Sequence, residues 1–179
     1  GAAASTLGAT TGSAAGVLAT HGEGAGALGA VTGSAAAALR IEGVAGASSG
    51  SFTLDIAAGG DDGFEYSSGY TDLTEPSFNV YNGSPYAGLL FRNIAIPAGA
   101  TVTSAHLSIY TTWSVYDSPA LTIRGQFGPA NFSAIDFNLS SRTKTAAGVS
   151  WVASNIGTGA YKASPDISAV LNEIVGTEG

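Results

Sequence analysis

The alternation of apolar and polar residues downstream of residue 50 predicts a series of β-strands. The clearest case is residues 101–110, where apolar side chains at positions 105, 107 and 109 alternate with polar ones, the two-residue period of a half-buried strand. The same period indicates strands at residues 51–56 and 121–127, and residues 149–152 also have strand character. The continuous apolar run Leu89–Phe91 predicts a central strand that is either buried on both faces or placed at a seam of the sandwich.

The two strongest strand patterns flank a turn sequence. Pro97-Ala98-Gly99 lies between residues 89–91 and residues 101–110, and Pro and Gly are typical turn residues. We therefore expect these two strands to form a hairpin around which the aromatic-rich part of the chain is organised.

One amphipathic helix is predicted near the end of the sequence. Ser164-Pro165-Asp166 is a typical helix start, because a capping hydroxyl, a first-turn proline and a carboxylate near the positive end of the dipole follow one another. Apolar residues at 167, 170, 171 and 174 then occupy one helix face, and Gly176 is expected to end the helix. Together with the strands, this predicts an all-β, jelly-roll-like β-sandwich over residues 51–179 with one short C-terminal helix.

Residues 1–50 differ from the remainder in composition and contain an internal repeat. They have no aromatic residue and no proline, and the sequence of Leu7–Ala15 recurs, with one substitution, as Leu28–Ala36, an offset of 21. A repeat that keeps its register is more than a flexible linker requires. We therefore interpret the segment as an extension of short strands with small side chains, which precedes the sandwich.

The strand character of the repeat is strongest around two pairs of apolar residues, Val17 with Leu18 and Leu39 with Ile41. Two alternatives remain, a flexible Gly/Ala linker and a helix over residues 35–40 that Ser34 would cap. Strands with such small side chains bury little surface alone, so they need a partner surface on the same chain or on another copy.

Charge and composition exclude several classes of function. The net charge is −7 and the six Lys and Arg residues are scattered singly, so a row of phosphates cannot be neutralised and nucleic acid is not an expected partner. The chain has no Cys for disulfides or thiolate chemistry, and no apolar run is long enough for a membrane span. A charged fraction of only 11% with abundant Gly, Ser and Thr is typical of secreted and virion proteins, and we expect an extracellular location.

The sequence offers no set of residues arranged for catalysis. His21 and His106 have no Cys or carboxylate at metal-ligand spacing, and no nucleophile motif occurs. We predict that the chain is not an enzyme. Asp61, Asp62 and Glu65 lie in a Gly-rich acidic loop and are candidate Ca²⁺ ligands. The favoured alternative is a solvated acidic loop, because the spacing matches no calcium-binding motif, and no other cofactor is expected.

Aromatic residues beside predicted turns are candidates for stacking on sugar rings: Tyr66, Tyr70, Tyr81, Tyr86, Trp113 and Tyr116. The favoured alternative is packing at core edges or subunit contacts, which is the commoner use of Tyr and Trp. Three Asn-x-Ser sequences, at Asn82, Asn131 and Asn138, are candidate glycosylation sites in a host that glycosylates.

The sequence of Phe91–Leu107 resembles the F-x-x-(I/V)-P-x-G-A-T-I-x-S-A-x-L hairpin of DNRLRE-type jelly-roll domains of secreted bacterial proteins. Further segments are similar to a variant in tailed-phage and environmental bacterial proteins: residues 61–63, 141–143, 149–151 and 165–175. The 21-residue repeat is similar to repeats in such phage structural proteins. The resemblance covers about residues 52–175 and implies the jelly-roll fold, but it is a poor guide to function.

Relatives of this kind continue into a further strand after the helix. We therefore expect the sandwich to lack this strand or to receive it from elsewhere. The function that we predict is a structural subunit of an extracellular filament or virion appendage. Residues 1–50 would be the assembly segment, adding strands around Val17, Leu18, Leu39 and Ile41 to a groove or open edge of a neighbouring copy. Such head-to-tail contacts produce filaments. The alternative is a carbohydrate-binding module of a secreted protein, with glycans as partners.

Overall fold

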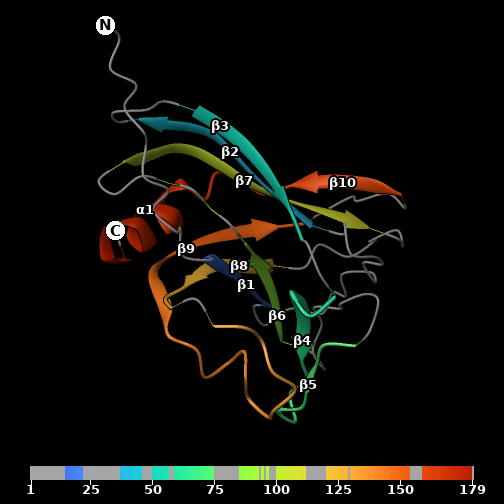
Figure 1. Ribbon diagram of the computed structural model, residues 1–179. Coiled ribbons are helices and arrows are strands. Elements are labelled where there is room, and N and C mark those ends of the chain that lie inside the picture. The colour runs from blue at the N-terminus through green and yellow to red at the C-terminus, as the bar shows by residue number, and fades with distance from the viewer. Residues whose placement is uncertain are drawn as a thin grey trace, which may run out of the picture.

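The described part of the chain is an all-β sandwich with one short C-terminal helix, as the sequence predicts. The computed structural model describes residues 15–21, 37–45, 50–56, 59–74, 85–92, 94, 96, 100–111, 120–128, 130–153 and 159–178. Two antiparallel sheets form the two layers (Figure 1). The jelly-roll topology stays a prediction.

The larger sheet has six strands in the order β5-β4-β6-β1-β8-β9. Their bounds are β1 (Ala15–His21), β4 (Asp62–Glu65), β5 (Thr71–Asp72), β6 (Tyr86–Phe91), β8 (Ala120–Gln126) and β9 (Lys144–Val152). The smaller sheet has four strands in the order β10-β7-β2-β3. Their bounds are β2 (Ala37–Ala45), β3 (Gly50–Asp55), β7 (Thr101–Thr111) and β10 (Ala160–Ala163).

The two copies of the repeat each contribute an interior strand, one to each sheet. β1 pairs with β6 and β8, and β2 pairs with β7 and β3. The strand interpretation of Val17-Leu18 and Leu39-Ile41 is thus confirmed, and the helical alternative is wrong for residues 37–40, which lie in β2. The predicted domain boundary at residue 50 falls between β2 and β3, which are adjacent strands of one sheet.

The expected hairpin between residues 89–91 and residues 101–110 is wrong. β6 lies between β4 and β1 in the larger sheet, whereas β7 lies between β10 and β2 in the smaller one. A hairpin requires two strands whose free edges meet across a short loop, and here other strands occupy both edges of each. Residues 92–100 therefore connect one sheet to the other.

The main core lies between the sheets. Its most deeply buried side chains come from both layers, with exposed fractions of 2% or less: Leu39, Ile41, Leu89, Phe91, Leu107, Ile109, Leu121 and Ile123. Leu90 belongs to a second, smaller cluster with Phe132 and Leu139. Because successive side chains of a strand point to opposite faces, β6 is buried on both faces, which is one of the two placements that its continuous apolar run predicts.

The helix α1 (Ser168–Glu178) packs on β7, β8 and β9 at one end of the sandwich (Figure 1). The predicted apolar face is confirmed, since Ile167, Val170, Leu171 and Ile174 are all buried. The predicted termini are wrong. Asp166, not Ser164, accepts the N–H of Ser168 at the helix start (2.9 Å), and the helix continues past Gly176 to residue 178.

Candidate functional site

β1 occupies a slot between two strands that come from much later in the chain. It pairs along its length with β6 on one side and with β8 on the other. Leu18, for example, lies opposite Gly88 of β6 and opposite Arg124 of β8. Without β1, the facing edges of β6 and β8 would each present a row of unpaired N–H and C=O groups, which is a template for strand addition.

Both walls of the slot have glycines against which other elements pack closely. A Cβ atom at Gly88 of β6 would lie 2.8 Å from the Phe132 ring and 2.9 Å from Leu139. A Cβ atom at Gly125 of β8 would lie 2.5 Å from the Ile174 side chain of α1. The segment of residues 127–143 therefore supports the β6 wall and α1 supports the β8 wall, so neither wall depends on β1 alone.

Two buried carboxylates hold the β6 wall to the segment of residues 127–143. Glu65 of β4 is 1% exposed and accepts the backbone N–H groups of Leu139 (2.8 Å) and Ser140 (3.0 Å). Asp61 is also 1% exposed, and both of its oxygens accept the Nε–H of Arg92 (2.9 and 2.8 Å). The Nη2 of Arg92 also donates to Asn131 Oδ1 (2.9 Å), so this ion pair extends into the segment.

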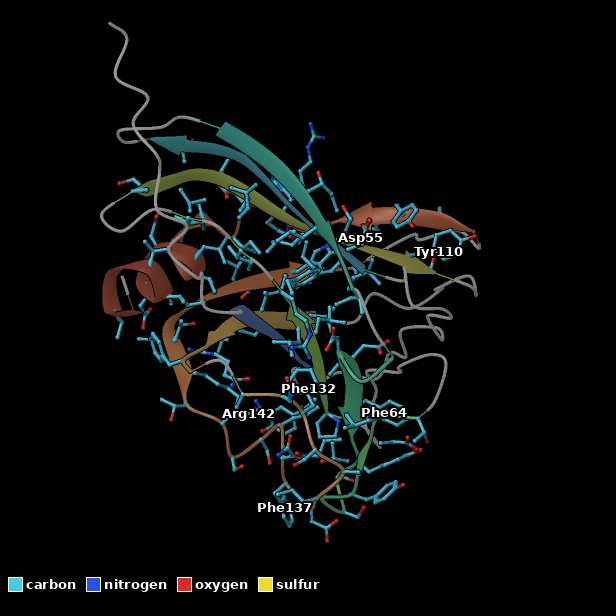
Figure 2. The ribbon with its side chains drawn as sticks, in the orientation of Figure 1. Asp55, Phe64, Tyr110, Phe132, Phe137 and Arg142 are labelled. Atoms are coloured by element: carbon cyan, nitrogen blue, oxygen red, sulfur yellow. The ribbon has the colours of Figure 1, made fainter. Side chains whose placement is uncertain are left out.

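Arg142 organises the same segment from within. Its guanidinium lies over the Phe132 ring, 4.8 Å from the centroid (Figure 2), and donates to the backbone carbonyls of Ala130, Asn131 and Asn138. Burial lowers the pKa of Arg142 below its usual value. Several charge-assisted hydrogen bonds from one side chain fix the path of a segment that has no regular secondary structure of its own.

The outer edge of β7 is paired at residues 102, 105, 107 and 108–111. β10 pairs with residues 108–111. Beyond β10, Ser164 Oγ accepts the N–H of residue 107 and the N–H of Ser164 donates to the C=O of residue 107. At residue 105, the N–H donates to Asp166 and the C=O accepts the N–H of Ile167. Asn172 of α1 then accepts the N–H of Val102 (2.8 Å) and donates to its C=O (2.9 Å), as a paired strand would. This edge is therefore closed to strand addition.

The edge strand β9 is blunted by a bulge and by one carboxylate. The pairing with β8 shifts register between Arg124 and Gln126, and the extra residues of β9 include Ala146 and Ala147. Glu173 of α1 accepts the N–H groups of both alanines (2.8 and 2.7 Å). Bulges and capped edges protect a sheet against unwanted pairing. The sequence shows Asn172 and Glu173 only as polar helix residues, so sequence reasoning missed both caps.

The three predicted calcium ligands do not form one site. Asp61 binds Arg92 and Glu65 binds backbone N–H groups, as described above. Asp62 is half-buried, and desolvation, reinforced by the nearby charge of Asp61, raises its pKa to about 6. Because residues 62–65 form a strand, positions 62 and 65 face opposite sides of the sheet. Within the described residues, no three Asp, Glu, His or Cys side chains are grouped to hold a metal ion.

The candidate glycosylation sites differ in accessibility. Asn82 lies outside the described residues. Asn138 is half-buried, and its Nδ2 donates to Ser133 Oγ (2.9 Å) while its Oδ1 accepts the N–H of Ser133. A glycan on this nitrogen would displace that pair of bonds. Asn131 is exposed, so it is the better placed acceptor of the two that the structure describes.

The structure brings two of the candidate stacking residues together. The rings of Tyr66 and Tyr70 stack, with centroids 5.9 Å apart and planes at 24°. Tyr86 is half-buried, and its ring lies 5.6 Å from Lys144 Nζ. The other three candidates lie outside the described residues: Tyr81, Trp113 and Tyr116. Sequence reasoning missed Ile135 and Phe137, whose exposed fractions are 62% and 53%.

No protein-family model matches the chain, and comparisons with curated proteins and with solved structures give no match either. The resemblance to DNRLRE-type domains therefore stays a prediction. In the part of the chain that the structure describes, no helix is sufficiently long and apolar to cross a membrane.

Proposed function

We propose that the chain is a structural subunit of an extracellular filament or virion appendage, and that copies assemble by exchanging β1. The observation that carries the proposal is the position of this strand. β1 fills an interior slot whose two walls, β6 and β8, come from residues 86–126 and are supported by other elements. A copy that lacks its own β1 would offer the same slot to the β1 of a neighbour.

The tether of β1 is long enough for such an exchange. Residues 22–36 connect β1 to β2, and a fully extended chain of that length spans at most about 50 Å. Packed sheets are only about 10 Å apart, so the connection exceeds what a crossing within one sandwich requires. Exchange of an identical element between copies keeps every pairing of the closed form, which makes it a low-cost route to assembly.

β2 is not suited to the same role. It forms an antiparallel pair with β3, from Ala38 opposite Asp55 to Val44 opposite Gly50, so it could not leave without its partner. Its side chains Leu39 and Ile41 are fully buried in the main core. We therefore assign the donor role to Val17 and Leu18 of β1, and an internal role to Leu39 and Ile41.

Capped backbone groups disfavour edge-to-edge pairing at two places, the outer edge of β7 and the bulge of β9, while β3 and β5 are the other outer strands of the two sheets. A foreign strand in the β1 slot gains two partners at once, because the slot lies between β6 and β8, whereas at an outer strand it gains only one. Each copy would donate one strand and accept one, which is a heterologous contact. Such contacts produce open filaments when the rotation between copies does not close a ring.

Engineered cysteines distinguish exchange between copies from pairing within one chain, because the natural chain has no Cys. Thr20 of β1 lies directly opposite Thr122 of β8. We expect the oxidised double variant Thr20→Cys/Thr122→Cys to form a ladder of covalent multimers on a non-reducing denaturing gel. A mixture of the two single variants should give covalent dimers.

The matched control shares one of the two positions. Ser150 of β9 also lies opposite Thr122, and both residues belong to the same sandwich in either case. The double variant Thr122→Cys/Ser150→Cys should therefore remain a covalent monomer. If Thr20→Cys/Thr122→Cys also gives only internally linked monomers in concentrated protein and in native assemblies, the proposed exchange is wrong.

A further inference from the structure

Exposed apolar side chains gather on two neighbouring loops at one tip of the sandwich. The first loop joins β4 to β5, and it is a tight turn in which Gly69 N–H donates to Tyr66 C=O and Tyr66 N–H donates to Tyr70 C=O (2.9 Å each). The second loop carries Ile135 and Phe137. We call this surface the aromatic tip and define it by the exposed Tyr70, Ile135 and Phe137 together with the half-buried Tyr66, which packs against the main core. Figure 2 shows Phe137 at its extremity.

Phe137 is held in an unfavourable backbone conformation that keeps its ring exposed. Among the described residues it is the one non-glycine residue with a positive φ, 60°, and such a φ costs free energy for a bulky side chain. Its N–H donates to Gly69 C=O (2.7 Å), and its ring rests on Gly69, where a Cβ atom would lie 2.5 Å from the ring. Backbone strain that presents an exposed aromatic ring points to a contact made by that ring.

The tip combines rigid ring faces with polar groups. Tyr66 and Tyr70 stack on each other while Tyr70 stays 50% exposed. Exposed Ser67, Ser68 and Asp136 adjoin the rings in the sequence. Fixed aromatic faces lose little conformational entropy on binding, and hydroxyl and carboxylate groups beside them can bond to the hydroxyls of a ligand.

The charges of the aromatic tip and of the whole chain indicate which class of ligand fits the tip. No Lys or Arg belongs to the aromatic tip itself, and the guanidinium of Arg142 behind the second loop is engaged by the Asn138 carbonyl and the Phe132 ring. The chain carries a net charge of −7, and Asp136 lies within the second loop. Anionic lipids, acidic polysaccharides and nucleic acids would be repelled from such a surface. A ligand with flat apolar faces, many hydroxyls and no charge fits best.

We propose that the aromatic tip is a binding site for neutral polysaccharides, whose pyranose rings would stack on Tyr70 and Phe137. This site is remote in sequence from β1 and its use does not depend on strand exchange. In an assembly of many copies, each copy would contribute one weak binding site for a glycan-coated surface, and the many sites together would raise the overall avidity.

The test is affinity electrophoresis in native gels that contain mannan, dextran, laminarin or xyloglucan, with alginate as the acidic polymer. We expect at least one neutral polysaccharide to retard the natural protein, and alginate not to. Tyr70→Ala and Phe137→Gly should each raise the Kd about tenfold, the effect of losing one aromatic contact. Tyr161→Ala removes an equally exposed ring, 59% exposed on β10, and should leave binding unchanged.

Phe137→Gly separates loss of binding from loss of folding. Glycine adopts a positive φ without strain, so this variant should melt at the same temperature as the natural protein or higher. Three results would overturn the proposal. The first is that no neutral polysaccharide retards the natural protein, and the second is that Tyr161→Ala and Phe137→Gly change the retardation by the same amount. The third is that the tip binds uncharged lipid vesicles and no polysaccharide. The covalent ladder of Thr20→Cys/Thr122→Cys should persist with Phe137→Gly added, so failure of one proposal leaves the other intact.

Discussion

The two repeat strands, β1 and β2, occupy similar places in different sheets but are tied to the chain in different ways. Each is an interior strand with an antiparallel neighbour on both sides. β2 is followed at once by β3, its partner in the same sheet, whereas both neighbours of β1 begin beyond residue 85. One strand is therefore part of a local pair, and the other is joined to its sheet only by long-range pairing.

This difference teaches that connectivity decides which strand can be exchanged. The repeat aligns Leu18 of β1 with Leu39 of β2, but β2 has Arg40, Ile41 and Glu42 where β1 has Ala19, Thr20 and His21. The two strands also differ in the free energy that is needed to remove each one from its sheet. β1 can leave its sheet by itself and open one slot between β6 and β8, whereas β2 is paired with the strand that follows it, β3, and Leu39 and Ile41 anchor it in the main core.

The largest effect should follow deletion of residues 1–21. The truncated chain loses the backbone pairing of β1 on both sides, and at about 1 kcal/mol per hydrogen bond this is on the order of 5 kcal/mol or more. We expect filaments to disappear in negative-stain electron microscopy, and the melting temperature to fall. A synthetic peptide of residues 1–21 should restore stability by filling the slot.

The matched control for this deletion is the same peptide with Val17→Pro. Proline lacks the N–H that an interior strand donates, so this peptide should not restore stability. Truncated chains that form the same filaments as the full chain would show that β1 is not the assembly element.

The second prediction tests the other half of the comparison, at β2. Leu39 is fully buried, and truncation of a buried leucine costs about 2–5 kcal/mol because a cavity remains. We expect Leu39→Ala to lower the free energy of unfolding by this amount, which urea unfolding would show as a lower midpoint. In the variant that still folds, the covalent ladder of Thr20→Cys/Thr122→Cys should be retained. Loss of the ladder without loss of stability would assign the donor role to β2.

The sequence predicted the elements that depend on local patterns, and it did not predict the features that depend on long-range pairing. The alternation around Leu107 and Ile109 and the helix face of Val170 and Leu171 are local periods, so both elements were predictable. The pairing of β6 and β7 is not local, and the turn sequence after Phe91 predicted a hairpin where the chain in fact changes sheets. The interior positions of the two repeat strands could not be predicted, because they depend on which edges β6 and β8, and β7 and β3, leave open.

The candidate site shows the same limit. Asp61, Asp62 and Glu65 are neighbours in sequence, and only the strand geometry of β4 shows that they have separate partners. The positive φ of Phe137 depends on its bond to Gly69, which is far away in sequence. No local pattern predicts it.

The third prediction concerns the β6 wall of the slot. Gly88→Ala would bring a Cβ atom within 2.8 Å of the Phe132 ring and 2.9 Å of Leu139. Overpacking of this kind costs about 1–3 kcal/mol, and it should loosen the segment of residues 127–143. We expect a lower melting temperature and faster amide exchange in that segment. Gly60→Ala is the control, because nothing lies within 4 Å of its added Cβ. Equal melting temperatures would mean that the segment does not support the wall.

The smallest effect concerns Asp62 on β4, which pairs with β6 opposite Leu89. Burial raises its pKa from 3.8 to about 6, so the folded chain holds this proton more tightly than the unfolded chain does. The contribution of Asp62 is therefore most favourable below about pH 4, and it is lost as the pH rises through 6. Asp62→Asn mimics the protonated form and should raise stability at pH 7 by about 1 kcal/mol, after allowance for solvent screening. Urea unfolding between pH 4 and 7 should show a flatter profile than that of Asp136→Asn, which removes the same charge from an exposed loop. Identical profiles for the two variants would mean that β4 holds Asp62 no differently from an exposed carboxylate.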